Sequence, residues 1–301
     1  MDFLPEKSQS GQALLIVLLV MAVVLTTVLS VASRSVVDIA TTSYEEDALR
    51  AFSAAEAGVE QALLKQGPVS SVLDPTANVG FNANLTNPVP GNVYVYPDPL
   101  SNGETATFWF VEHNASDNSL TCSGGNCTRT AQLNICWGNN PGINSLTPAV
   151  EISIYYDPLQ QAFGIPNSFG GLKVIRLTSD RNTARTPPNS FDSAQSGCPF
   201  GGYAFESGNI QLVSEITSCS VNTDNCLVMA KVRMFYNATP QPIALRTTGG
   251  THAELPPQGF QVDSKGTAGE SVRNLNVLRT YPEPQGVFES AVFSRNSLTK
   301  P

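Results

Sequence analysis

Hydrophobic residues dominate one segment near the start of the chain, where residues 12–33 contain no charged side chain and Arg34 is the first charge to follow. As an α-helix these 22 residues extend roughly 33 Å, about the thickness of the hydrocarbon core of a membrane. A backbone that spans a membrane must satisfy its own hydrogen bonds, and a helix does so. The pattern therefore predicts a transmembrane helix in this segment.

The helical pattern continues beyond Arg34, but its character changes. A stripe of side chains recurs at helical steps of three and four residues among many alanines: Leu49, Phe52, Glu56, Val59 and Leu63. This spacing predicts an amphipathic helix that runs to about Lys65, where Gly67 and Pro68 end it. Residues 12–66 thus form one predicted stalk helix, roughly 80 Å long and transmembrane in its first half.

After Pro68 the pattern changes to short runs of β-branched and aromatic residues separated by Pro, Gly and Asn. Residues 105–112 and 151–156 alternate between apolar and polar positions, as half-buried antiparallel strands do. Further strands are predicted over residues 92–96, 130–137, 149–156, 172–178, 210–221, 227–236, 243–247, 259–263 and 271–279. The fold class expected is α+β, with a predominantly antiparallel β-rich region over residues 67–301 that forms one large or two small domains.

Six cysteines lie in this β-rich region, which places it in an oxidising compartment outside the cytoplasm. Six cysteines allow 15 pairings, so their number alone does not define the connectivity. The local sequence reads as strand, turn and strand around Cys122 and Cys127, and again around Cys219 and Cys226. We expect these two pairs to form disulfides and leave Cys136 with Cys198. Zinc binding fits these spacings poorly because no histidine is near them, and no metal site is expected.

The composition favours a structural or binding role over catalysis. The net charge is −8, only 14% of residues are charged, and no basic stripe is present, which argues against a dedicated nucleic-acid site. The two histidines, His113 and His252, have no nucleophile motif beside them, and no phosphate-binding loop occurs. We expect neither an enzyme nor a cofactor. The turn at residues 222–225 has oxygen ligands for calcium, but a turn of this composition needs no metal.

A long irregular stretch over residues 179–209 interrupts the strand pattern. Loops of this length inside a compact domain are uncommon and are often functional. A tolerated insertion explains it equally, because long surface loops cost little stability. Both interpretations, a binding surface and an insertion, are open at the level of the sequence.

Three segments together resemble a known family. Gly11 ends a short polar leader directly before the apolar run, and residues 45–58 contain the sequence AFSAAEAG. These features are similar to type IV pilin-like proteins, specifically the minor-pilin group that is PilX-like. Residues 271–294 also resemble the final strands of related bacterial surface proteins. The resemblance implies that a prepilin peptidase removes residues 1–11 by cutting between Gly11 and Gln12. It also implies that the stripe from Leu49 to Leu63 packs against the protein's own sheet.

The chain departs from the major pilins at two positions. Gln12 stands where they carry Phe or Met as the first mature residue, and Ile16 stands where they carry Glu as the fifth. In the family this Glu pairs with the amino terminus of a neighbouring subunit, and proteins without it are typically minor components. The leader carries a net charge of −1 where basic residues are usual. A plain membrane anchor or signal peptide is the alternative interpretation of the apolar run.

The function expected is therefore that of a minor structural subunit of a type IV pilus or a related type II secretion filament. Its partners would be other pilin-like subunits, the prepilin peptidase and, before assembly, the inner membrane. It would cross that membrane once, with the β-rich region outside, and reach the cell surface within a filament. The alternative is a membrane-anchored surface binding module, adhesin-like, that never polymerises.

Overall fold

A computed structural model describes residues 10–114, 117–163, 171–185 and 189–283, with side chains from Leu14 onward. One long amino-terminal helix is followed by sheets that are mostly antiparallel and by three disulfides, which confirms the α+β class. The chain divides into two units. The first comprises residues 1–85 and 262–277, and the second comprises residues 86–261 and 278–301. This division differs from the expected boundary at residue 66, because the strands nearest the helix belong to the helix's unit.

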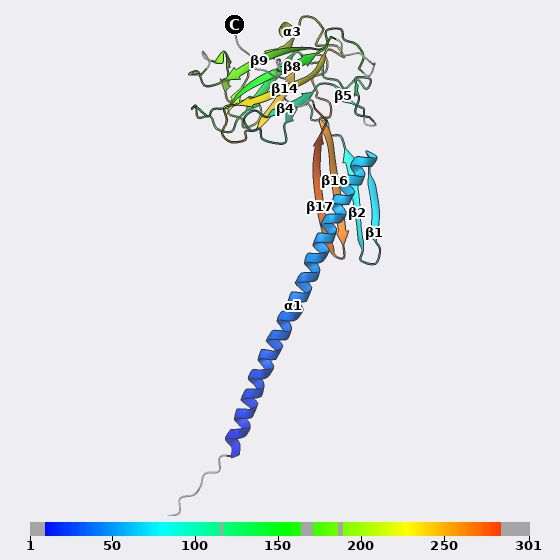
Figure 1. The fold of residues 1–301 in the computed structure, drawn as a ribbon, viewed down its shortest axis with the longest axis vertical. Coiled ribbons are helices and arrows are strands. Elements are labelled where there is room, and N and C mark those ends of the chain that lie inside the picture. Colours follow the sequence, from blue (N-terminus) through cyan, green and yellow to red (C-terminus); the bar gives the residue numbers. More distant parts are fainter. Residues whose placement is uncertain (1–9, 115–116, 164–170, 186–188, 284–301) are drawn as a thin grey trace, which may run out of the picture. The chain divides into compact units, whose positions relative to one another are not determined.

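Helix α1 spans Ser10–Lys65 without interruption (Figure 1). It ends where Gln66 adopts a left-handed conformation with φ of 51°. The amide of Gly67 then donates to the carbonyl of Ala62 over 3.3 Å, which is the 6→1 bond of a Schellman motif. Pro68 cannot continue the helix, so the stop predicted from Gly67 and Pro68 is present with its expected chemistry.

The sheet of the first unit has the strand order β1-β2-β16-β17. Its strands span Val69–Asp74, Val79–Thr86, Gly259–Ala268 and Ser271–Thr280. The sequence-based predictions did not include β1 and β2, although Val79, Phe81, Ala83 and Leu85 alternate with other residues along β2. Asp74 starts the turn between them, because its carboxylate accepts hydrogen bonds from the hydroxyl and amide of Thr76 and from the amide of Ala77. The hydroxyl of Thr76 is the main cause that lowers the pKa of Asp74.

The second unit contains two larger sheets. One has the order β10-β9-β8-β14-β4 and the other β11-β12-β7-β15-β3, with β13 also paired to β7. The first sheet's strands span, in that order, Asp192–Ser193, Lys173–Asp180, Ala149–Tyr156, Leu227–Phe235 and Thr105–Trp109. The second sheet's span Gln195–Ser196, Phe205–Glu206, Gln132–Trp137, Ile243–Thr248 and Val93–Val95, and β13 spans Ile210–Gln211. A separate pair joins β5 (Glu112–His113) to β6 (Leu120–Thr121).

Both larger sheets contribute to one buried apolar cluster. Its largest fully buried side chains include Phe108, Trp137, Ile152, Phe205 and Met234. On β8 the core residues alternate as the sequence predicted, with Val150, Ile152 and Ile154 all almost completely buried. The other face of β8 is covered in part as well, because Ala149 and Ser153 are buried and Glu151 and Tyr155 are half-buried.

The prediction of one long strand over residues 210–221 is wrong. Only β13 is extended, and helix α3 (Leu212–Glu215) follows it directly. The amide of Ile216 donates to the carbonyl of Leu212 over 2.8 Å, so one helical turn places both apolar side chains in the core. Both are at most 2% exposed. Two apolar residues four positions apart lie on the same face of a helix. In a strand the residue midway between them would lie on that face too and would have to be buried.

The irregular stretch after β9 is held at several points. Asp180 is completely buried, and Arg185 donates to both of its carboxylate oxygens at 3.0 and 3.1 Å. The same guanidinium donates to the carbonyls of Ser145 and Thr147, and Asn189 donates to Asp180. Three short strands, β10 to β12, lie in the stretch as well. A buried ion pair whose remaining polar atoms are hydrogen-bonded fixes a loop in one conformation.

Candidate functional site

Helix α1 presents two different faces over its last four turns, and this difference defines the candidate site. The face against its own sheet consists entirely of small residues. Its almost completely buried positions are Ala51, Ala54, Ala55, Gly58 and Ala62. Phe81, Ala83 and Val262 of β2 and β16 pack against them. Small side chains let the axis of the helix lie close to the sheet.

Two residues of β16 make this approach unusually close. A Cβ atom on Gly266 would lie 2.0 Å from the carbonyl oxygen of Ala51, and one on Gly58 would lie 2.3 Å from the hydroxyl of Ser264. That hydroxyl is buried and donates to the carbonyl of Ala55 over 2.7 Å. The strand therefore contacts the helix backbone directly, which only glycine and other small residues permit.

The stripe predicted to pack on the sheet is only partly the buried face, and this corrects the sequence-based expectation. Leu49 is 69% exposed, Phe52 is 42% exposed, and Glu56 is also exposed. Val59 and Leu63 are half-buried at the border of the contact. The sheet packs against the alanine and glycine face because only small side chains let the two backbones approach closely. Hydrophobic periodicity identifies only the positions of the large apolar side chains.

The first half of α1 has no packing partner among the described residues. Its large apolar side chains from Leu14 to Ile39 are between 52% and 71% exposed. Thr26, Thr27, Thr41 and Thr42 donate their hydroxyls to carbonyls one turn earlier in the helix, so these hydroxyls need no water. By length and composition, α1 is the one helix of the described chain that is able to cross a membrane.

The predicted processing site lies at the start of this helix. The backbone of Gly11 and Gln12 is helical, and residues 1–9 of the predicted leader lie outside the described residues. Ile16 is 61% exposed on the apolar surface. Cleavage between Gly11 and Gln12 stays a prediction.

Two of the three disulfides join the cysteines that the local sequence paired, and the third joins the two cysteines that remained. Cys122 bonds to Cys127, Cys219 to Cys226, and Cys136 to Cys198, with Cα–Cα distances of 5.4, 5.9 and 5.9 Å. The hairpin interpretation behind two of these pairs is only partly right. The strand β6 ends immediately before Cys122 and β14 begins immediately after Cys226, but no strand flanks the other side of either loop.

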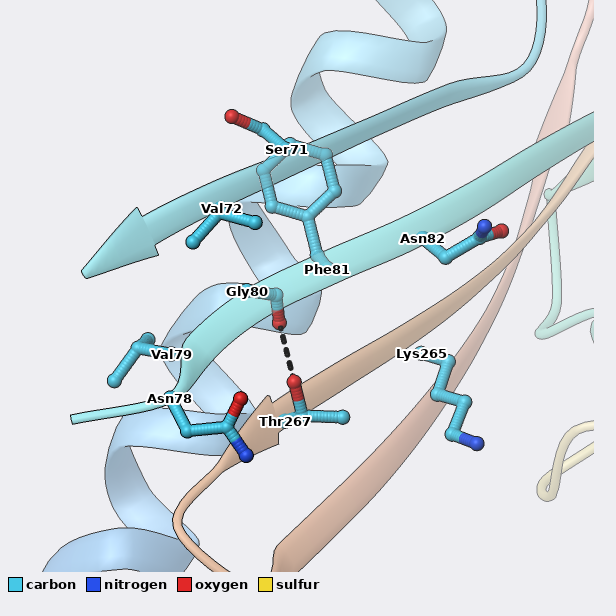
Figure 2. Close-up of a pocket in the computed structure, with 9 residues that line it drawn as sticks. All are labelled: Ser71, Val72, Asn78, Val79, Gly80, Phe81, Asn82, Lys265 and Thr267. Carbon is cyan, nitrogen blue, oxygen red and sulfur yellow. Dashed lines mark hydrogen bonds between the residues drawn. The ribbon is translucent and has the colours of Figure 1, made fainter. Parts of the chain in front are cut away.

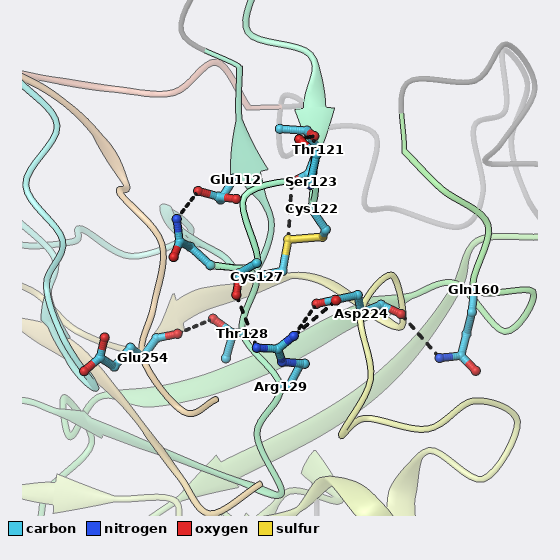
Figure 3. The surroundings of a disulfide bond; sticks show 12 residues. Glu112, Thr121, Cys122, Ser123, Cys127, Thr128, Arg129, Gln160, Asp224 and Glu254 are labelled. Atoms are coloured by element: carbon cyan, nitrogen blue, oxygen red, sulfur yellow. Dashed lines mark hydrogen bonds and ion pairs between the residues drawn. A yellow bond between two sulfur atoms is a disulfide. The ribbon is translucent and has the colours of Figure 1, made fainter. Parts of the chain in front are cut away.

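An arginine that sequence reasoning did not single out joins the two small disulfide loops. Arg129 donates to both carboxylate oxygens of Asp224, at 3.0 and 3.1 Å, and to the carbonyl of Gly125 at 3.2 Å. Figure 3 shows its guanidinium between the Cys122–Cys127 loop and Asp224. Gln160 adds bonds to Thr223 and to the carbonyl of Asp224. The carboxylate considered as a calcium ligand therefore serves an ion pair, and no local sequence signal links Arg129 to it.

His113 lies in an aromatic cluster of the second unit. Its ring stacks on Tyr281 with 3.8 Å between centroids and meets the edge of Trp109 at 4.6 Å. Tyr281 in turn contacts Phe260. Burial is the main cause that lowers the pKa of His113 to about 4, and a hydrogen bond to the backbone at Val111 acts in the opposite direction. Among the described residues its Nδ1 atom has no hydrogen-bond partner. The neutral ring is thus a packing element.

The first unit has a hollow of about 300 Å³ on its sheet. Gly80 lies in it, and Val72, Asn82, Lys265 and Thr267 surround it (Figure 2). Thr267 donates its hydroxyl to the carbonyl of Gly80 over 3.3 Å. A Cβ atom on Gly80 would lie 2.9 Å from the carbonyl oxygen of Ser71, so the close approach of β1 and β2 leaves little space for a side chain there. The hollow follows from strand packing and carries no group of distinctive chemistry beyond one lysine.

No group of three or more His, Cys, Asp or Glu side chains that could hold a metal ion occurs in the described part of the chain. Comparison with protein families, with curated proteins and with solved structures gives no match.

Proposed function

We propose that this chain is a minor structural subunit of a type IV pilus or a related type II secretion filament. The observation that carries the proposal is the division of α1 into an unpartnered apolar half and a half whose small-residue face is already covered. The exposed positions that continue from the apolar half, such as Leu49 and Phe52, are free for contact with neighbouring subunits.

Assembly would exchange one environment of α1 for another. Before assembly the apolar half lies in the inner membrane, with the two β-rich units outside the cytoplasm. In a filament the same side chains pack against the helices of other subunits. Lipid tails are as apolar as these side chains, so the gain comes from helix packing, which Ala and Ser at close-approach positions favour.

A substitution on the exposed face tests the proposal. Leu49→Asp places a charge at a position that is 69% exposed in the isolated chain, so the stability of the protein should change by no more than about 0.5 kcal/mol. Burial of that charge between subunits is strongly unfavourable. We expect the variant to be absent from sheared filaments although its membrane level is normal.

The matched control is Leu64→Asp in the last turn of α1, where the leucine is 83% exposed. This variant makes the same chemical change far from the apolar half and should still reach the sheared fraction. Equal incorporation of the Leu49→Asp variant and the wild type would contradict assembly through this face.

A non-polymerising membrane-anchored binding module is the second candidate. Arg129 and the two small disulfide loops favour it, because a rigid, cross-linked loop cluster suits ligand binding. Mass spectrometry and cell fractionation separate the two candidates. A filament subunit should begin at Gln12, accumulate as an uncleaved precursor when Gly11 is replaced by a bulky residue, and occur in sheared filaments. An anchored module should stay in the membrane fraction under all shear conditions.

A further inference from the structure

The larger sheet that contains β4 is covered on its outward face, but only over part of its width. Thr107, Lys231 and Ser153 lie opposite one another in a row across β4, β14 and β8, which are neighbours in this sheet (Figure 1). These residues are only 7%, 2% and 4% exposed. Arg176 continues the row on β9, and its side chain is 41% exposed. The covered region thus includes β4, β14 and β8 and ends at β9.

The next row of the same face shows the same change. Trp109 on β4 and Met229 on β14 are 7% and 6% exposed, whereas Val174 on β9 is 40% exposed. Neither Trp109 nor Met229 belongs to the buried apolar cluster that the two larger sheets share. The covered residues of both rows form the outer patch, defined as Thr107, Trp109, Ser153, Met229 and Lys231.

Two polar groups show what the cover of the outer patch has to supply. The hydroxyl of Thr107 is buried and has no hydrogen-bond partner among the described residues, although buried polar groups normally have one. Lys231 is buried as well, and a buried ammonium is rarely stable without an opposite charge or hydrogen-bond acceptors next to it. An apolar segment with hydroxyl groups and a negative charge therefore suits the patch.

The last part of the described chain lies beside the outer patch. Tyr281 is 3% exposed, and its ring stacks on His113, whose ring meets the edge of Trp109. The amide of Tyr281 donates to the carbonyl of Gln258, and the side chain of Gln258 binds the backbone amide and carbonyl of Trp109 at 2.7 and 2.9 Å. From Tyr281 to Glu289 an extended chain reaches up to about 27 Å, whereas the length of β4 is about 17 Å. The residues that follow Tyr281 are therefore able to reach the whole patch.

Residues 286–294, which lie outside the described residues, have the composition that such a cover needs. Their sequence, GVFESAVFS, combines valine, alanine and phenylalanine with two serines. Glu289 is the one charged residue of this segment, and Lys231 is the one charged residue of the outer patch. The segment and the patch are thus complementary in apolar surface, in hydrogen-bonding groups and in charge.

We propose that residues 286–294 pack across the outer patch of their own chain. The aromatic rings of the segment cover Trp109 and Met229, and the carboxylate of Glu289 accepts a hydrogen bond from the ammonium of Lys231. This contact closes the outward face over β4, β14 and β8 to other polypeptides. It lies within one chain and forms whether or not the chain polymerises.

Thiol labelling of the full chain in lipid nanodiscs tests the contact. All six cysteines are in disulfides, so Ala291→Cys and Val292→Cys each introduce a single thiol that a maleimide can modify. These neighbouring positions point in different directions, and at least one of them should react at least about tenfold more slowly than Leu64→Cys on α1, where the leucine is 83% exposed. Reaction of both thiols at the rate of the Leu64→Cys variant would overturn the proposal.

The charge pair is tested in the variant whose thiol is protected. Glu289→Gln should raise its labelling rate about tenfold, because a hydrogen bond between charged groups contributes at least that much to docking. In a Lys231→Met background the same change should have no effect, since the partner is already absent. Glu254→Gln, which alters an exposed glutamate of the same unit outside the patch, is the control and should leave the rate unchanged. Near-ultraviolet circular dichroism checks that each variant is folded.

Photo-cross-linking identifies what occupies the outer patch. A benzoylphenylalanine introduced at Phe288 should form cross-links to peptides of β4, β14 or β8. In a mixture of unlabelled and ¹⁵N-labelled chains, both peptides of each cross-link should carry the same label. Cross-links that join different labels would assign the patch to a second copy and overturn the proposal. Cross-links confined to other parts of the chain, or an equal effect of Glu289→Gln in both backgrounds, would overturn it as well.

Discussion

Gly266 and Ser264 determine which face of α1 is buried, although neither lies in the helix. Gly266 lets the backbone of β16 contact the carbonyl of Ala51, and the hydroxyl of Ser264 donates a hydrogen bond to the carbonyl of Ala55. Both contacts require that the helix offer alanine and glycine at the interface. The AFSAAEAG segment, which carries the family resemblance, therefore serves intramolecular packing through its small residues and leaves Phe52 and Glu56 exposed.

Gly266→Ala should destabilise the first unit by about 1–3 kcal/mol, the usual range for overpacking a tight contact. The added methyl group would meet backbone atoms of α1 at 2.0 and 2.5 Å, so the helix and strand have to separate. Hydrogen exchange of the full chain in nanodiscs measures the effect as loss of protection in β2 and β16.

The control for this variant is Gly67→Ala, where the nearest atom that a Cβ would meet is 3.9 Å away. That change should alter the opening free energy measured by hydrogen exchange by no more than about 0.5 kcal/mol. Equal protection in the Gly266→Ala variant and the wild type would show that the close contact does not stabilise the unit.

His113 should make the stability of the second unit depend on pH in mildly acidic solution. Its pKa is about 4 in the folded protein and 6.5 in the unfolded chain, so the unfolded state binds the proton more tightly. The contribution of His113 to stability is fully present above pH 6.5 and decreases as the pH falls from 6.5 to about 4. Below about pH 4 this histidine causes no further change in stability.

Thermal unfolding monitored at several pH values between 4 and 7.5 checks this prediction. His113→Phe keeps the aromatic contacts with Trp109 and Tyr281 but has no titrating group, so its melting temperature should vary less across the window. His252→Phe is the control, and it should retain the wild-type pH dependence. A slope that is the same in the His113→Phe variant would assign the effect to other groups.

The three disulfides differ greatly in the length of chain that they close. Cys136 and Cys198 are separated by 62 residues, whereas the other two pairs are separated by 5 and 7. The long bridge ties β7 to the irregular stretch after β9, next to the short strands β11 and β12. The short bridges stiffen loops that Arg129 already holds together.

Removal of the long bridge by Cys136→Ala and Cys198→Ala should therefore cost more stability than removal of a short one. Restriction of the unfolded chain predicts a loss of about 4 kcal/mol for the long loop and about 2 kcal/mol for either short loop. Denaturant unfolding of the full chain under non-reducing conditions provides the comparison. A larger loss for a short bridge would show that local strain or packing outweighs chain entropy.

The proposed place of this chain in a filament depends on the amino-terminal end of α1. Under the proposed function, Ile16 would stand where major pilins carry the glutamate that pairs with a neighbouring amino terminus. A copy of this protein added inside a growing filament would leave a buried charge unpaired, which costs several kcal/mol. A subunit added first, or placed at the tip, escapes most of this penalty.

Quantitative proteomics of sheared filaments should accordingly find this chain at low copy number. Ile16→Glu should raise its share, because the new carboxylate restores the missing partner. Ile39→Glu, which adds the same group near the end of the exposed apolar surface, should not raise it. Copy numbers equal to or above those of every other pilin-like protein would contradict the assignment as a minor subunit.

Local patterns in the sequence were sufficient for the long apolar half of α1, its end at Gly67 and Pro68, strands such as β8 and β14, and the three disulfide pairs. Each of these features depends on residues that are close in sequence or on a small number of remaining partners. Periodicity, turn residues and short cysteine spacings report such contacts directly.

Tertiary contacts were needed for the buried face of α1, for the pairing of β2 with β16, and for the ion pair of Arg129 with Asp224. The hydrogen bond from Ser264 to Ala55 spans 209 residues, and the ion pair of Arg129 with Asp224 spans 95. No local pattern encodes such partners. The positions of these partners depend on how closely two backbones approach each other. Side-chain volume on both sides of the interface sets that distance, whereas hydrophobicity along the chain does not.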